Sequence, residues 1–156
     1  MKKSILLIAF AIVLFACKSQ SVTNTKVDNK TERVIKGNWN ITNVSFPGSE
    51  VLKVTSFDLA DSKCFINSSW NFVSNNNKGT LTLRDASCIS FSSPITWFIN
   101  KDGNFVMKIL NDYKAKKVDQ GYVLRVANVT ETSFQLVDKI NVGGSIKEIV
   151  YQFQKQ

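Results

Sequence analysis

The sequence predicts an all-β domain, an antiparallel up-and-down barrel of about eight strands. Short runs rich in β-branched and aromatic residues recur along the chain, separated by Gly, Asn, Asp, Ser and Pro. Within these runs apolar and polar residues alternate, which is typical of strands with one buried and one solvated face. No long stretch has the period of an amphipathic helix. Closure into a barrel would leave such a sheet without exposed edges.

Nine segments have the composition of strands. In chain order they are residues 37–45, 51–57, 69–73, 79–84, 95–100, 104–110, 121–128, 133–137 and 145–154. The separators at 75–79 and 100–103 contain Asn and Gly, which tolerate the positive φ of tight hairpin turns. Since most connections are short, we expect neighbours in sequence to pair as antiparallel hairpins. Residues 111–117 are the exception, a charged loop or short helical turn.

The alternation assigns one face of each segment to the core. That face carries Trp70, Phe72, Leu81, Leu83, Ile95, Trp97, Ile99, Phe105, Met107, Ile109, Tyr122, Leu124, Val126, Phe134, Leu136, Ile149, Tyr151 and Phe153. A barrel of eight strands either fills its interior with side chains or holds one small ligand. The 11 Phe, 3 Trp and 3 Tyr of the chain suit both outcomes.

The N-terminus has the layout of an export signal. Lys2 and Lys3 precede an apolar stretch at residues 5–15 that is too short to span a bilayer. The sequence "LFAC" that ends at Cys17 resembles the lipobox of bacterial lipoproteins, in which the cysteine is acylated. We therefore expect residues 1–16 to be a signal peptide and Cys17 to carry palmitate or similar chains. The alternative is an ordinary signal peptide that leaves a free cysteine.

The residue after Cys17 indicates the membrane to which the lipoprotein is sorted. Lys18 is not the aspartate that resembles an inner-membrane retention signal, so we expect an outer-membrane lipoprotein that faces the periplasm. The polar segment that follows lacks aromatic residues, so residues 17–34 are expected to form a lipidated, flexible tether. An extra N-terminal strand or helix is the alternative. Residues 35–156 then form one barrel domain.

The charge of the chain is +8, and it falls to +6 (18 basic minus 12 acidic) without Lys2 and Lys3. An exported chain does not meet nucleic acid, so we expect no such partner. The remaining candidate partners are anionic lipid headgroups, cell-wall polymers or an acidic ligand. The alternative is a basic surface that is only solvated and binds no partner.

The cysteines form an even pair once Cys17 is acylated. Cys64 and Cys88 are then expected to form a disulfide, which is common in exported chains. Closing a loop of this size stabilises the fold by about 3 kcal/mol. Two free thiols are the alternative; a metal site is disfavoured because the chain has no histidine.

The sequence offers little for catalysis. The absence of histidine excludes Ser-His-Asp triads and His-based zinc sites. Asp58 and Asp61 have the setting of turn formers, and no Gly-rich phosphate motif joins a strand to a helix. We therefore expect neither an enzyme nor a cofactor.

The segment "GNW" at residues 37–39 resembles the Gly-x-Trp motif of lipocalins. The ordered pattern beyond it, from "DSKCFINSSWNFVSNNNKGTLTL" through "ITWFINKDGNFVMKI" to "IVYQFQK", is similar to lipocalin-like lipoproteins of Bacteroidetes. The resemblance implies a lipocalin-like barrel in which Trp39 closes one end against a basic residue from a late strand. Arg125 and Lys155 are the candidates for that residue.

The first functional hypothesis is a small hydrophobic or amphipathic ligand bound in the barrel cavity of a lipid-anchored envelope protein. An envelope interaction module with a filled barrel and an inhibitor of an envelope enzyme are the alternatives. The residues expected to close the barrel or line a pocket are Gly37, Trp39, Trp70, Phe72, Trp97, Tyr122 and Tyr151. For each of them a purely structural place in the core is the competing interpretation.

Overall fold

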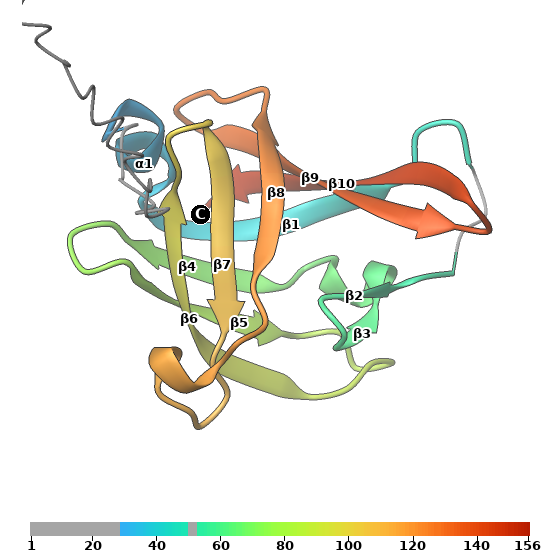
Figure 1. Ribbon diagram of the computed structural model, residues 1–156, viewed down its shortest axis with the longest axis horizontal. Coiled ribbons are helices and arrows are strands. Elements are labelled where there is room, and N and C mark those ends of the chain that lie inside the picture. Colours follow the sequence, from blue (N-terminus) through green and yellow to red (C-terminus); the bar gives the residue numbers. More distant parts are fainter. Residues whose placement is uncertain (1–28, 50–52) are drawn as a thin grey trace, which may run out of the picture.

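The computed structural model describes residues 29–49 and 53–156, which form a barrel with a short helix at one end and two small strands at the other (Figure 1). In chain order the elements are α1 (Asn29–Ile35), β1 (Gly37–Ser45), β2 (Thr55–Ser56), β3 (Ala60–Asp61), the 3-10 turn η1 (Ser62–Phe65), β4 (Ser69–Val73), β5 (Lys78–Leu83), β6 (Phe91–Ile99), β7 (Asn104–Ile109), the 3-10 turn η2 (Ala115–Lys117), β8 (Tyr122–Ala127), β9 (Ser133–Val142) and β10 (Ser145–Lys155).

The predicted fold class is confirmed. Eight strands form a closed barrel in the order β1-β10-β9-β8-β7-β6-β5-β4, and every neighbouring pair is antiparallel. Strand β1 closes the barrel, because Trp39 lies opposite Lys155 of β10 on one side and opposite Trp70 of β4 on the other. This up-and-down order is the one that the lipocalin resemblance implied.

Aromatic side chains fill the middle of the barrel. Phe134 and Phe153 stack with ring centroids 4.5 Å apart, and Trp97 stacks on Phe105 at 5.6 Å. Phe72 lies between these pairs and contacts a ring of each. All five side chains are essentially buried. Each contributes about 1.5–3 kcal/mol by leaving water, so this cluster contributes substantially to the stability of the fold.

One predicted barrel strand is wrong. Residues 51–52 lie outside the described residues, and the rest of the 51–57 segment forms only β2, which pairs with β3 in a separate two-stranded sheet. The chain reverses directly after β2, because Phe57 and Asp58 adopt positive φ angles of 54° and 47°. Two residues in the left-handed region end a strand, and neither is the glycine that usually marks such a turn.

The folded domain begins earlier than its sequence suggests. The C-terminal end of the expected 17–34 tether is helix α1 in the structure, which agrees with the alternative of an N-terminal helix for that part. Glu32 is buried and its carboxylate accepts a hydrogen bond from the Ile99 backbone N–H at 3.2 Å, which fixes the helix to β6. The signal peptide and Cys17 lie outside the described residues. Within residues 29–49 and 53–156, no helix has the length and apolar character needed to cross a bilayer.

Two strands extend by four or five residues beyond a predicted end. Strand β6 begins at Phe91 rather than Ile95, and β9 continues to Val142. The β9–β10 hairpin turns at Gly143 and Gly144, with φ angles of 58° and 85°, and its tip projects from the barrel (Figure 1). Since β8 pairs with β9 only from Val137 back to Gln135, the outer part of the hairpin lies beyond the barrel wall.

Candidate functional site

The end of the barrel next to α1 is closed by Trp39. Its indole N–H donates to the Ile35 carbonyl at 2.7 Å, and its ring meets Phe134 edge-on at 4.7 Å. The ammonium of Lys155 lies 5.7 Å from the ring centroid, in cation–π range. Of the two basic candidates, Lys155 is therefore the partner of Trp39. Gly37 starts β1 with a φ of 126°, a conformation that requires glycine.

The opposite end of the barrel, the mouth, is covered by residues 53–68, which we name the plug. A chain of buried hydroxyls joins the plug to β10. Ser62 Oγ donates to the Val54 carbonyl at 2.8 Å, so it accepts from Ser56 Oγ at 2.6 Å. Ser56 in turn accepts from the Tyr151 hydroxyl at 2.5 Å. Burial raises the pKa of Tyr151 far above its usual range, so this hydroxyl keeps its proton and stays a donor.

Phe57 is the centre of the plug. Its ring stacks on Tyr151 at 5.4 Å and meets Phe65 and Tyr122 edge-on at 5.2 and 5.1 Å. A positive φ is costly for a bulky aromatic residue, by about 1–3 kcal/mol, and persists only where the surroundings enforce it. Here the three ring contacts, together with the hydrogen bond from Tyr122 Oη to the Phe57 carbonyl at 2.7 Å, hold that conformation.

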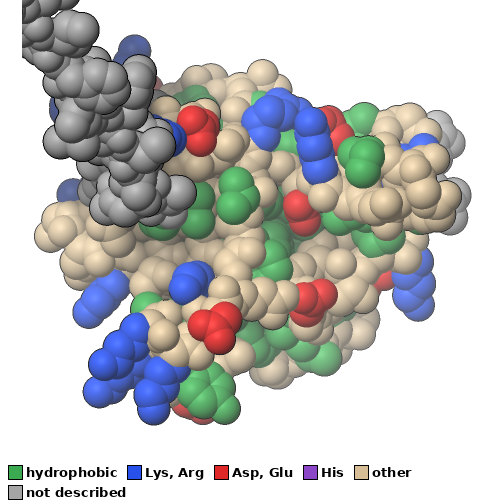
Figure 2. Space-filling model, viewed as in Figure 1, with side chains coloured by type: hydrophobic (Ala, Val, Ile, Leu, Met, Phe, Trp, Pro, Cys, Tyr) green, Lys and Arg blue, Asp and Glu red, His purple; other side chains and the backbone are tan. Residues whose placement is uncertain are grey.

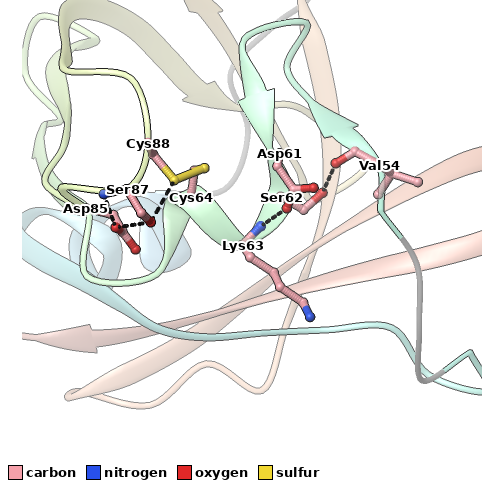
Figure 3. Close-up of a disulfide and its surroundings, with 8 residues drawn as sticks. All are labelled: Val54, Asp61, Ser62, Lys63, Cys64, Asp85, Ser87 and Cys88. Carbon is pink, nitrogen blue, oxygen red and sulfur yellow. Dashed lines mark hydrogen bonds between the residues drawn. A yellow bond between two sulfur atoms is a disulfide. The ribbon is translucent and has the colours of Figure 1, made fainter.

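A disulfide fastens the plug to the loop between β5 and β6 (Figure 3). Cys64 and Cys88 are bonded, as predicted, with Cα atoms 5.8 Å apart. Both sides are locally ordered by aspartates, since Asp61 accepts from the Lys63 backbone N–H at 2.9 Å and Asp85 accepts from Ser87. Asp61 is thus the turn former that the sequence predicted.

A cleft opens at the mouth between the plug and the loop that joins β7 to β8. We name it the mouth cleft; its volume is about 310 Å³. It is lined by Phe57, Asp58, Leu59, Phe91, Ile109, Leu110, Asn111, Tyr113, Lys117, Val118, Asp119, Gln120 and Tyr122. This volume is at the lower end of the range of small-molecule sites, and the mixture of apolar and polar lining residues is typical of them.

The polar groups of the mouth cleft come from both of its walls. Gln120 donates to the Asp58 carboxylate, which joins the β7–β8 loop to the plug. Burial, and to a smaller extent the charges of Asp58 and Asp138, raises the pKa of the Tyr122 hydroxyl. Asp138, which is outside the lining of the cleft, lies opposite Ile149 on β9 and β10, and burial raises the pKa of its carboxyl group. A ligand here would meet an apolar floor with hydrogen-bonding groups around it.

The seven residues predicted for closure or ligand binding occupy three places. Gly37 and Trp39 lie at the closed end, whereas Trp70, Phe72, Trp97 and Tyr151 are buried in the core. The indole N–H groups of Trp70 and Trp97 are bonded within the protein, to Ser68 Oγ at 2.8 Å and the Lys78 carbonyl at 3.0 Å. Tyr122 is the member of the set that lines the mouth cleft.

Sequence reasoning missed most of the cleft. Phe57 was assigned to a strand, and Asp58 to a turn without further function. Ile109 was assigned only to the inward face of a strand, and Leu59 and Gln120 carry no local signal, because the cleft forms only when the plug docks beside the β7–β8 loop. Across the described ranges, no three acidic, sulfur or imidazole side chains are placed to hold a metal ion.

Comparisons with known proteins give the chain no family. No family model matches it, and no curated protein matches it. One solved structure that resembles it is the complex of bovine odorant binding protein with a selenium-containing odorant. That match has 12% sequence identity and a TM-score of 0.45, and it covers 85% of this chain and 76% of the other. A likeness this distant assigns no function, and the barrel assignment here rests on the chain's own strand pairing.

Proposed function

We propose that this protein binds a small hydrophobic or amphipathic ligand in the mouth cleft, as a lipid-anchored component of a bacterial envelope. The observation that carries the proposal is a cleft of about 310 Å³ with an apolar floor and a polar rim. Because stacked aromatic rings occupy the centre of the barrel, we propose the mouth rather than the middle as the ligand site.

The plug supports this assignment because several contacts hold it in the place where a binding wall is needed. Phe57 keeps a costly backbone conformation, and the disulfide and the hydroxyl chain hold the segment against the barrel. A preformed wall lowers the ordering cost of binding. We therefore propose binding rather than catalysis for the cleft, since of its two carboxylates, Asp58 and Asp119, the first is already hydrogen-bonded to Gln120.

The binding test uses residues 18–156, which include the whole described barrel, and the neutral probe N-phenyl-1-naphthylamine. We expect its fluorescence to rise on binding and Leu59→Glu to weaken the affinity at least about tenfold, since a charge replaces apolar floor. Val123→Glu is the control, because Val123 is exposed and lies away from the cleft lining. Circular dichroism verifies that each variant is folded. Equal probe affinity in both variants would contradict the proposed site.

The proposed anchor is Cys17, with the outer membrane facing the periplasm as the proposed location. Its support is the sequence "LFAC", which resembles a lipobox, and the non-acidic residue Lys18. Labelling of cells with a palmitate analogue should mark the wild-type chain and not Cys17→Ser. Incorporation of the label in both would refute lipidation at this residue.

A second candidate function is a protein-interaction module of the envelope. The projecting β9–β10 hairpin favours it, because Ile146 near its tip is 65% exposed. A photo-crosslinking amino acid at position 146 should then capture a partner in intact cells, whereas one at the exposed turn residue Asp102 should not. The same crosslinks from both positions would argue against a specific surface.

A further inference from the structure

A second hollow lies on the outer wall of the barrel, and we name it the outer slot. Its volume is about 400 Å³. It is lined by Lys78 and Gly79 of β5, Pro94, Ile95 and Thr96 of β6, and Leu110, Lys114 and Ala115 of the loop that follows β7. The slot is separate from the mouth cleft, with which it shares Leu110 alone.

The strand register explains which residues of β5 and β6 form the floor of the outer slot. Lys78 pairs with Thr96, and Thr80 pairs with Pro94, so these side chains share the outer face of the sheet. The β7–β8 loop leaves the wall at Leu110, whose N–H donates to the Pro94 carbonyl at 3.0 Å. The loop then folds back over β6 and supplies the second wall.

This second wall is held in place. The Lys108 ammonium donates to the Val118 carbonyl at 2.7 Å, which ties the far end of the loop to β7. Within the loop, the N–H of Tyr113 donates to the Leu110 carbonyl and the N–H of Lys117 donates to that of Lys114, both at 2.8 Å. The slot is therefore a formed feature of the domain.

The charges at the slot have one sign. Lys78 and Lys114 are both exposed at its edge, and no acidic side chain is among the eight residues that line it. Lys116 and Lys117 follow on the same loop, where Figure 2 shows a group of basic side chains at the lower left. The mouth cleft differs, since Asp58 and Asp119 line it beside the single basic residue Lys117.

We propose that the outer slot binds an anionic amphiphile, a molecule with an alkyl or acyl chain and a carboxylate or phosphate head. The apolar side chains of Pro94, Leu110 and Ala115 would contact the alkyl or acyl chain of the ligand. The ammonium groups of Lys78 and Lys114 would pair with the head by charge-assisted hydrogen bonds. This site is independent of the ligand proposed for the mouth cleft.

The test follows ¹⁵N–¹H spectra of residues 18–156 during titration with dodecanoate and dodecyl phosphate below their micelle concentrations. We expect shifts in the amide signals of Gly79, Thr96 and Ala115, which line the outer slot and not the mouth cleft. Dodecyltrimethylammonium has the same chain with the opposite charge and should not produce them. Equal shifts with the cationic probe, or shifts confined to Leu59 and Tyr122 in the mouth cleft, would overturn the proposal.

Paired variants test the lysines. Lys78→Gln with Lys114→Gln should weaken dodecanoate binding at least about tenfold, since both charge-assisted contacts with the head are lost. The control variant combines Lys101→Gln with Lys139→Gln. It changes the net charge by the same amount, at two exposed lysines outside the slot. Neither pair should alter binding of the neutral probe in the mouth cleft. Equal losses in both pairs would show non-specific attraction and refute the site.

Sedimentation with vesicles distinguishes the two possible sources of the amphiphile, a bilayer lipid and a free fatty acid. If the slot takes a lipid from a bilayer, the protein should sediment with phosphatidylglycerol vesicles and not with phosphatidylcholine vesicles, and the loss of Lys78 and Lys114 should release it. If it takes a free fatty acid, dodecanoate binds and the vesicles do not. Lysine-dependent binding in either form supports the site, and its absence in both refutes it.

Discussion

Tyr151→Phe removes one buried hydroxyl at the point where β10 holds the plug. The ring contacts of Tyr151 with Phe57 at 5.4 Å and Phe65 at 6.2 Å are retained, so the loss is that of the hydrogen bond to Ser56 Oγ. Ser56 still donates to Ser62 in the variant and no buried donor is stranded. We therefore expect the free energy of unfolding to fall by about 1 kcal/mol.

Ser56→Ala is the complementary change and should cost more, about 1–3 kcal/mol, because it leaves the buried Tyr151 hydroxyl without its acceptor. In that background Tyr151→Phe should be neutral or stabilising. Urea unfolding followed by tryptophan fluorescence measures all four proteins of the cycle. Tyr113→Phe is the control, since its side chain is 65% exposed. The same cost for Tyr151→Phe in both backgrounds would refute the hydroxyl chain.

The other predictions concern the disulfide, a buried carboxyl and the closed end. Replacing Cys64 and Cys88 with Ala should lower the free energy of unfolding by about 3 kcal/mol. A reducing agent should then have no further effect on urea unfolding. An unchanged urea midpoint in the variant would contradict a stabilising role of the disulfide. Asp138→Asn should stabilise the protein at neutral pH. Burial raises the pKa of the Asp138 carboxyl in the folded state, so the stability of the wild-type protein falls as pH rises from the ordinary aspartate pKa near 3.8 through the raised pKa. The stability gained by Asp138→Asn should therefore vanish at acidic pH. A gain that persists at acidic pH would have another cause. Lys155→Met keeps the alkyl chain and should lose about 0.5–1 kcal/mol in thermal unfolding, whereas no loss would show that the contact with Trp39 is not stabilising.

The sequence predicts the barrel well where alternation and turn residues agree. Strands β1 and β4 have the predicted bounds, Gly37–Ser45 and Ser69–Val73, because clear alternation is interrupted by Gly, Asn or Ser. The prediction for residues 51–57 was wrong for the opposite reason. Their composition suits a strand, but the left-handed turn at Phe57 and Asp58 contains no glycine that would indicate it in the sequence. Helix α1 is too short and too polar to show a helical period.

The candidate site was predicted less well, because it depends on tertiary docking. Tyr122 was identified as an inward-facing aromatic residue, but its partners in the cleft come from residues 57–59 and 109–120, which no local pattern connects. The choice between Lys155 and Arg125 as the partner of Trp39 required strand register. Lys155 lies opposite Trp39, whereas Arg125 pairs with Glu148 at 3.3 Å.

Native mass spectrometry of residues 18–156, purified from the periplasm of its own host, tests the ligand-binding claim most directly. We predict a reproducible added mass that is lost on denaturation. In the Lys78→Gln with Lys114→Gln background, which removes the charges of the outer slot, the added mass should persist, and Val123→Glu should leave it in place there. Leu59→Glu in the same background, which alters the mouth cleft, should remove it. A bare mass for the wild-type protein, or an added mass that Leu59→Glu leaves in place in that background, would contradict a ligand in the mouth cleft.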